Sequence, residues 1–348
     1  MRALFYWPTK GRFAPILRSR ISIFGRTGPF FAESLNVVSL PSGERFLSLT
    51  ASRPFFIVET NRWLQEPARG AIIITVIRQR PTMTGISVDQ RFENVVDTEL
   101  YPLDDENFRR ECKRTLDKHG ALVLRSFLRP GAIESVRREG DENQHLAYYT
   151  VDDHNIYLTP SDPEFPDDHP RNRRVASSKG CITTDQIPPG SALHTLYESE
   201  IFRDFLCSVL GESELHEYAD PLSSINLHYA ADGQELGWHY DNSSFAITLM
   251  IQNPEDGGIF EYVKDVRDAD SGEMNYELSG KVLDGEIDTE KLSMDAGALV
   301  LFRGRNSMHR VTPSIGDRTR MLVVLAYNTE PGISLSESAR MTFYGRLG

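Results

Sequence analysis

The chain has 348 residues, of which 40% are hydrophobic and 25% are charged, as is ordinary for a globular protein with a sizeable core. A formal net charge of −12 repels nucleic acid, so no nucleic-acid partner is expected. Cys112, Cys181 and Cys207 are odd in number and scattered, which indicates neither a disulfide framework nor a cysteine-based zinc site and favours a reducing, cytoplasmic location. No apolar run approaches the roughly 18 to 20 residues that span a bilayer, so no membrane partner is expected.

Residues 1–82 differ in charge from the rest of the chain. They hold 12 Lys or Arg against 4 Glu and no Asp, a balance of +8, so the remaining residues carry −20. Three interpretations stay open for this basic extension. In the first, the start codon is assigned too early and the protein begins at Met83. In the second, the extension is a genuine small β-rich segment. In the third, residues 1–32, which contain no acidic residue, direct the protein to an organelle. Residues 83–348 are expected to form one catalytic domain.

The first half of that domain contains predicted helices. Asp104, Asp105 and Glu106 precede a helix over 108–119, where acidic side chains suit the helix dipole, and Gly120 ends it. The further predicted elements are a strand at 121–124, a helix at 130–138, a long ordered loop at 150–190 and a helical segment at 191–210.

The second half reads as short apolar strands separated by turn residues, which favours antiparallel β-structure. The predicted strands cover 224–229, 236–241, 245–252, 296–302, 308–311 and 318–327. An acidic and polar stretch, 264–293, interrupts them. It is either a hairpin that folds over the pocket as a lid or a solvated insertion.

The predicted strand at 236–241 carries the most informative motif of the chain. His239 and Asp241 are two residues apart, so their side chains face the same side of the strand, and His309 follows on a later strand. Two imidazoles and one carboxylate occupy one face of a six-coordinate metal and leave the other face open, as in non-haem Fe(II) oxygenases. These three residues are therefore the predicted catalytic metal ligands.

Arg318 and Arg320 share one face of the last predicted strand, close to His309. A planar guanidinium holds a carboxylate through two parallel hydrogen bonds, which a simple metal-binding protein would not need. By contrast, His216 and His228 are predicted to be ordinary surface or core histidines.

The order of these motifs carries a family resemblance. The chain resembles the Fe(II)/2-oxoglutarate-dependent dioxygenase superfamily in its prolyl-hydroxylase-like branch, closely over 222–330 and more loosely from about 103. The matching motifs are Leu227-His228-Tyr229, Asp232-Gly233-Gln234, His239-x-Asp241, Gly257-Gly258, Gly297-Ala298-Leu299, His309 to Pro313 and Gly316 to Arg320. The stretches 238–245, 303–309 and 326–332 are similar to the radical halogenases that act on free amino acids and to their hydroxylase relatives. In those halogenases a small residue replaces the carboxylate ligand, whereas this chain keeps Asp241.

The resemblance implies an α+β fold in which helices flank a double-stranded β-helix, the cupin-like jelly roll. It also implies that His239, Asp241 and His309 bind Fe(II), with 2-oxoglutarate and O2 as co-substrates. Arg320, eleven residues after His309, is the first choice for the far carboxylate of 2-oxoglutarate, and Arg318 is the alternative. Tyr229 is predicted to donate a hydrogen bond to the same carboxylate.

The expected function is hydroxylation of an unactivated C–H bond of a small molecule, a free amino acid or a derivative, with release of succinate and CO2. Desaturation, epimerisation and ring closure stay open. Predicted substrate-binding residues are Trp238, Asn328, Arg173 and Arg174. Two alternatives remain, a peptidyl hydroxylase of the prolyl type and a catalytically silent metal-binding or sensor protein of the same fold.

Overall fold

The computed structural model describes residues 88–348 and, before them, only strand segments, and it divides the chain into two compact units, Met1–Gly85 and Ile86–Gly348. In the first unit β4 (Ser34–Ser39), β5 (Arg45–Thr50), β1 (Arg2–Trp7) and β6 (Ile74–Ile77) form an antiparallel sheet in that order, and β2 (Phe24–Gly25) pairs with β3 (Gly28–Pro29). The three interpretations of residues 1–82 remain predictions.

The second unit begins with helices whose ends follow local chemistry. In α2 (Glu106–His119) the Asp105 carboxylate accepts a hydrogen bond from the Phe108 backbone at 2.8 Å, and Gly120 ends the helix with φ of +73°. These are the predicted boundaries to within two residues. The other helices of this layer are α1 (Val88–Val95), α3 (Pro130–Asn143), α4 (Ala192–Tyr197) and α5 (Glu200–Leu210), with short 3₁₀ turns at Gln144–Leu146 and Thr184–Gln186.

The main sheet contains every strand predicted from the sequence. Its strand order is β15 (Glu290–Leu292), β14 (Phe260–Val263), β17 (Met308–Val311), β11 (Leu236–His239), β9 (Arg174–Ile182), β10 (Ile225–Ala230), β19 (Arg320–Leu325), β12 (Ala246–Gln252), β16 (Leu299–Phe302) and β7 (Ala121–Leu124). Each neighbouring pair is antiparallel. A small separate ladder joins β13 (Asp256–Gly257) to β18 (Ser314–Ile315).

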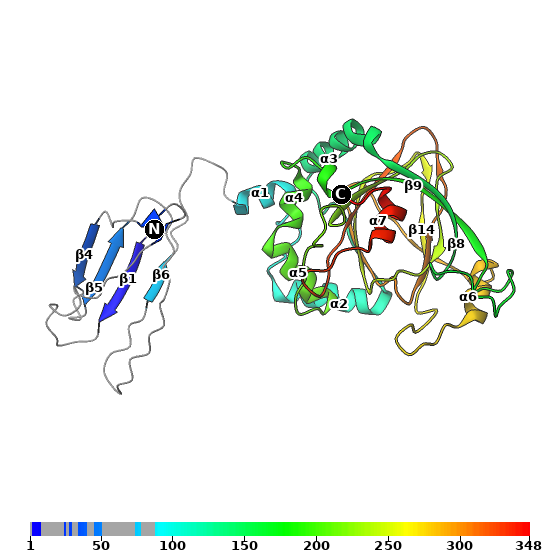
Figure 1. The fold of residues 1–348 in the computed structure, drawn as a ribbon, viewed down its shortest axis with the longest axis horizontal. Coiled ribbons are helices and arrows are strands. Elements are labelled where there is room, and N and C mark those ends of the chain that lie inside the picture. The colour runs from blue at the N-terminus through cyan, green and yellow to red at the C-terminus, as the bar shows by residue number, and fades with distance from the viewer. Residues whose placement is uncertain are drawn as a thin grey trace. The chain divides into compact units, whose positions relative to one another are not determined.

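The two ends of this strand order approach each other and nearly close the sheet into a barrel. The rings of Phe260 in β14 and Phe302 in β16 lie 4.9 Å apart between centroids, and the Tyr262 hydroxyl donates to the carbonyl of His119, just before β7. The α2–α5 layer covers one side of the barrel (Figure 1). The predicted jelly roll flanked by helices is confirmed.

Strand alternation decides which side chains face the helices. Leu227 and Tyr229 of β10 share one apolar cluster with Leu116 of α2, Val136 of α3 and Phe205 of α5. Successive strand residues point to opposite faces, so the residues between them face the barrel interior. Among the described residues, no helix is long and apolar enough to cross a membrane.

The predicted loop at 150–190 is interrupted by two strands. β8 (Tyr148–Asn155) pairs with β9 along its whole length, from Tyr148 opposite Cys181 to Asn155 opposite Arg174, so the loop is confined to 156–173 and to the residues after Ile182, which include one 3₁₀ turn. β8 is a largely exposed edge strand with polar residues on both faces, so it lacks the apolar alternation that marks a strand in sequence.

Candidate metal centre

Neighbouring strands bring the three predicted ligands together. His239 at the end of β11 lies directly opposite His309 of β17 in the strand register. Asp241 follows β11, and its Oδ1 lies 3.6 Å from His239 Nε2 and 3.5 Å from His309 Nε2. The ligand atoms of these residues all lie within 4.8 Å of one another, close enough to bind one ion.

Backbone contacts fix which nitrogen of each imidazole faces the centre. His239 Nδ1 lies 2.8 Å from the carbonyl of Gly237, and His309 Nδ1 lies 3.0 Å from the carbonyl of Ser307. A carbonyl only accepts hydrogen bonds, so each Nδ1 carries the proton and each Nε2 presents a lone pair. Metal-binding histidines are commonly oriented by a backbone carbonyl in this way.

The Asp241 carboxylate is held where only a metal or a donor would satisfy it. Its Oδ2 is buried without a hydrogen-bond partner. Burial alone would raise the pKa of Asp241, but the neighbouring His309 and His239 hold it well below its usual value, so the group is ionised. Gly304 makes room for it, because a Cβ at Gly304 would collide with the carboxylate. Burial and the proximity of His309 lower the pKa of His239, which favours the neutral, metal-binding form.

Aromatic rings surround His309 on the barrel face. Phe302 meets its imidazole edge-on at 4.8 Å between centroids, and Phe260 stacks on it at 5.4 Å. Both imidazoles of the centre are buried, whereas the Asp241 side chain keeps 22% exposure. The rings fix the second imidazole and leave the approach on the Asp241 side.

A buried cation without a counter-ion lies on the same barrel face. Arg320 is 5% exposed, and its Nε and Nη2 have no hydrogen-bond partner among the described residues. Burial lowers the pKa of Arg320 to about 10, still far above neutral pH. Gly258 leaves space for its side chain, since a Cβ there would lie 2.9 Å from Arg320 Cδ. An unpaired buried charge is costly, so this guanidinium fits the binding of an anion such as a carboxylate.

The family model described as Halogenase D matches residues 104–342. The chain belongs to the Halogenase D family. This match confirms the resemblance to radical halogenases and their dioxygenase superfamily that the motifs predict. No curated protein matches the sequence.

Several solved structures are similar to this protein in outline. A 2OG-Fe(II) oxygenase family oxidoreductase from Burkholderia pseudomallei is 12% identical, with coverage of 66% of this chain and 95% of its own and a TM-score of 0.42. A Pseudomonas putida prolyl-4-hydroxylase is 14% identical, with coverage of 63% and 98% and a TM-score of 0.38. HygX from Streptomyces hygroscopicus, with nickel, 2-oxoglutarate and hygromycin B bound, is 15% identical, with coverage of 68% and 95% and a TM-score of 0.40. The assignment of the chain to its family depends on the family model and not on these similar structures.

The two predicted arginines of this protein differ in their surroundings. Arg318 is exposed, and its guanidinium donates to the backbone carbonyls of Asn253 and Pro254, each at 2.7 Å. Those bonds fasten the turn after β12 and leave the group away from the buried face. Of the two arginines, Arg320 is the one whose buried Nε and Nη2 have no hydrogen-bond partner among the described residues.

Tyr229 and Trp238 are not where the sequence predicted. The Tyr229 hydroxyl donates to the carbonyl of Gly140 in α3 at 2.8 Å, on the helix side of the barrel wall, so it does not face Arg320. Trp238 points away from its neighbour His239, into a second apolar cluster with Tyr240 and Met308, and the Arg310 guanidinium lies 4.8 Å above its ring. Alternation along the strands places both on the outer face.

Asn328 and the two arginines of the long loop also lie elsewhere. The backbone of Asn328 pairs with His216 beyond the end of β19, which runs from Arg320 to Leu325. Arg173 forms an ion pair with Asp284, and Arg174 is exposed at the first residue of β9. None of the three is brought to the metal centre.

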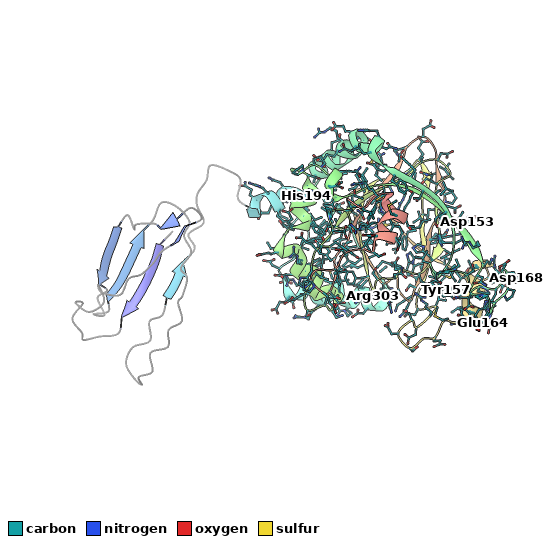
Figure 2. The ribbon with its side chains drawn as sticks, viewed as in Figure 1. Asp153, Tyr157, Glu164, Asp168, His194 and Arg303 are labelled. Atoms are coloured by element: carbon teal, nitrogen blue, oxygen red, sulfur yellow. The ribbon has the colours of Figure 1, made fainter. Side chains whose placement is uncertain are left out.

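The insertion 264–293 packs against the outside of the ligand-bearing strand. It contains α6 (Tyr276–Leu283), whose Ser279 hydroxyl lies 2.9 Å from the Tyr240 hydroxyl. Tyr240 stands between His239 and Asp241 and points the opposite way, stacking on Tyr157 at 5.5 Å. The loop 156–173 covers α6, and Figure 2 shows its Glu164 and Asp168 at that end of the domain. The insertion is packed through α6, whereas Asp270 and Glu273 are exposed, and the lid and the solvated insertion stay predictions.

Two basic residues that the sequence did not assign to the site lie on the barrel face. His228 follows Leu227 and precedes Tyr229, so it faces inward, and Lys179 Nζ lies 3.4 Å from its Nδ1. Alternation within β10 was the available signal for His228; nothing in the sequence marked β9.

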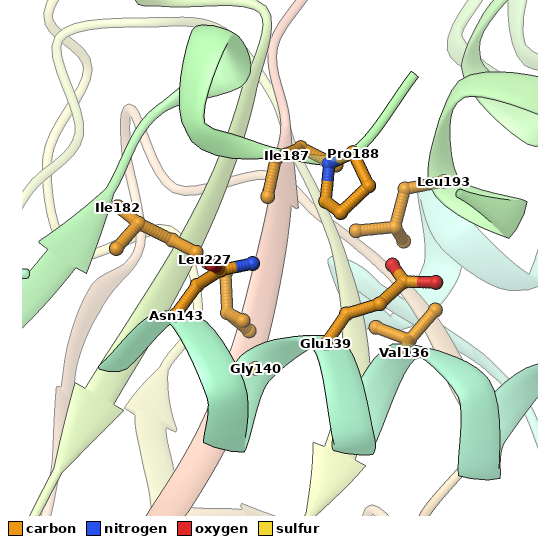
Figure 3. Close-up of a pocket in the computed structure, with 9 residues that line it drawn as sticks. All are labelled: Val136, Glu139, Gly140, Asn143, Ile182, Ile187, Pro188, Leu193 and Leu227. Atoms are coloured by element: carbon orange, nitrogen blue, oxygen red, sulfur yellow. The ribbon is translucent and has the colours of Figure 1, made fainter. Parts of the chain in front are cut away.

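A separate small pocket lies between α3 and the segment around Pro188 (Figure 3). Its lining is apolar except for Glu139 and Asn143, and it contains none of the predicted site residues. The pocket lies on the helix side of the barrel strands, the side to which Tyr229 points when its hydroxyl donates to α3. The pocket therefore plays no part in the metal centre.

Proposed function

We propose that this protein is an Fe(II)- and 2-oxoglutarate-dependent dioxygenase that hydroxylates a small molecule, a free amino acid or a derivative of one. The observation that carries the proposal is the pairing of an open His–Asp–His centre with the unpartnered guanidinium of Arg320 on one barrel face. A metal-binding protein without a co-substrate has no use for a buried cation that lacks a counter-ion.

Each residue of the centre then has a definite task. His239 and His309 bind the metal through Nε2, and Asp241 binds it through a carboxylate oxygen. Arg320 binds the far carboxylate of 2-oxoglutarate with two charge-assisted hydrogen bonds, which orients the co-substrate toward the metal. When bound, Fe(II) and 2-oxoglutarate supply the oxidising chemistry with O2 that the side chains themselves lack.

Asp241 supports hydroxylation over halogenation. In the halogenases that the sequence resembles, a small residue leaves a metal position open for chloride. Here a carboxylate fills that position, and Gly304 provides the space it needs. We therefore propose hydroxyl transfer as the reaction of this Halogenase D family member.

The test is an anaerobic titration of the purified protein with Fe(II) and 2-oxoglutarate, followed by the visible charge-transfer band of the chelate. The wild type should develop the band, and Asp241→Ala and His309→Ala should weaken it, because each variant loses one of three protein ligands. Absence of the band in the wild type would overturn the dioxygenase proposal. If the band forms, free amino acids are screened for O2-dependent succinate release.

A further inference from the structure

The inner face of the barrel carries a second cation, Lys179, close to the metal centre. Lys179 lies on β9, which pairs with β8 along one edge and with β11 and β10 in turn along the other. Cys181 pairs with His228, so Lys179, two residues earlier, shares the face of His228. Its Nζ lies 3.4 Å from His228 Nδ1, and both side chains are partly exposed.

The same face leads to the metal ligands. Ser177, two residues before Lys179, contacts His154 Nε2 at 2.6 Å, and the His154 ring meets that of His239 edge-on at 6.3 Å between centroids. On the other side, Arg320 pairs with Ala230, two residues after His228. Lys179 thus lies on a strip that runs from Arg320 to the first ligand strand.

His228 is neutral and accepts a hydrogen bond from Lys179, so it positions the lysine without adding a second positive charge. Burial and the positive charges of Lys179 and Arg320 keep the pKa of His228 well below its usual value, so the ring is neutral. A neutral Nδ1 lone pair accepts a hydrogen bond from the Lys179 ammonium. Burial also lowers the pKa of Lys179, which the charge of Asp241 partly opposes.

Lys179 has no anionic partner of its own. No Asp or Glu within the described part of the chain lies at ion-pair distance from it, and its one side-chain hydrogen bond goes to His228. A ferrous ion, Asp241, Arg320 and the 2-oxoglutarate dianion together are electrically neutral. Lys179 is therefore an excess positive charge in the filled site, and a partly exposed ammonium there is free to pair with an anionic group.

We propose that Lys179 binds a carboxylate of the substrate, with His228 as the positioning residue. The inference rests on the proposed function and narrows its substrate to acid-bearing small molecules, of which free amino acids are one class. It replaces Arg173 and Arg174, which the sequence suggested for this task. An internal residue of a peptide has no main-chain carboxylate, so the assignment disfavours the peptidyl alternative.

The experiment compares Lys179→Met with Lys179→Arg, and uses Lys113→Met as a matched control, because Lys113 forms an exposed helix pair with Asp117. The probes are the free amino acids and their amides, which differ only in the acid group. Three quantities are measured: the affinity for 2-oxoglutarate from the charge-transfer band, the kcat and KM of succinate release, and thermal stabilisation of the Fe(II)-loaded protein by each probe.

We expect the wild type to prefer an acid over its amide and Lys179→Met to lower kcat/KM for the acid by about 30- to 1000-fold, chiefly through KM. Affinity for 2-oxoglutarate should stay within about twofold, because Arg320 supplies that contact. Lys179→Arg should retain part of the preference, Lys113→Met all of it, and His228→Gln should weaken it without abolishing it.

Four results would overturn the assignment. They are a wild type that accepts the amide as well as the acid, a wild type that no acid stabilises, a Lys179→Met protein whose main loss is affinity for 2-oxoglutarate, and an equal loss for acid and amide. Failure of the proposed function is distinct, since the wild type would then form no charge-transfer band at all.

Discussion

Arg320 offers the sharpest quantitative prediction. Arg320→Met removes two buried donors, Nε and Nη2, that have no protein partner, while keeping an apolar side chain of similar reach. A hydrogen bond to a charged group contributes about 1.5 to 3 kcal/mol, so two should contribute roughly 3 to 6 kcal/mol to 2-oxoglutarate binding. At about 1.4 kcal/mol per factor of ten, the dissociation constant should rise by roughly 100-fold to 20,000-fold.

The same substitution should not weaken the fold. An unpaired buried charge is unfavourable, so removing it should leave the free energy of unfolding of the metal-free protein unchanged or raise it by about 1 to 3 kcal/mol. Affinity is measured by anaerobic titration of the charge-transfer band, and stability by urea unfolding.

Arg318→Met is the matched control. It removes the hydrogen bonds to Asn253 and Pro254, so about 1 kcal/mol of stability should be lost while the affinity for 2-oxoglutarate stays within about twofold. The interpretation of Arg320 would be refuted by an Arg320→Met protein with near wild-type affinity, or by an equal loss of affinity in the control.

Two further predictions concern space and charge. Gly304→Ala should lower the affinity for Fe(II) at least about tenfold, because the new Cβ displaces the Asp241 carboxylate. Gly190→Ala is the control and should keep the wild-type affinity, since nothing lies within 4 Å of a Cβ at that position. The metal content after dialysis measures both. Asp220 accepts hydrogen bonds from the backbone of Leu335 and from neighbouring groups; burial alone would raise its pKa, but these bonds lower it. The stabilisation by ionised Asp220 is therefore fully present above the ordinary pKa of about 3.9 and is lost as the pH falls below it. The free energy of unfolding should drop more steeply between about pH 5 and 2.5 in the wild type than in Asp220→Asn. Parallel curves for the two proteins would contradict this.

Local features of the sequence predicted the elements that local chemistry controls. The helix at 108–119 begins at an Asp cap and ends at Gly120, interactions that lie within a few residues of one another. The strand pattern around His239 and His309 follows from period-two alternation, which the buried inner and outer faces enforce.

The strands β8 and β9 show where such prediction stops. β8 has no apolar face because it is an exposed edge, and its pairing with β9 is a contact between segments separated by the loop 156–173. Since Lys179 lies on β9, the prediction of a loop at 150–190 also concealed that residue from any assignment to the site.

The sequence by itself predicted the three candidate metal ligands that the structure brings together, because two residues on one strand and one on a later strand carry their chemistry and spacing with them. Only the tertiary structure separated Arg320 from Arg318, which share a face in the sequence pattern. The pairing of β19 with β12 brings the carbonyls of Asn253 and Pro254 to Arg318 and leaves Arg320 buried and unpaired. Side-chain direction follows from position along a strand, whereas the partner of a charge depends on which distant segments fold beside it.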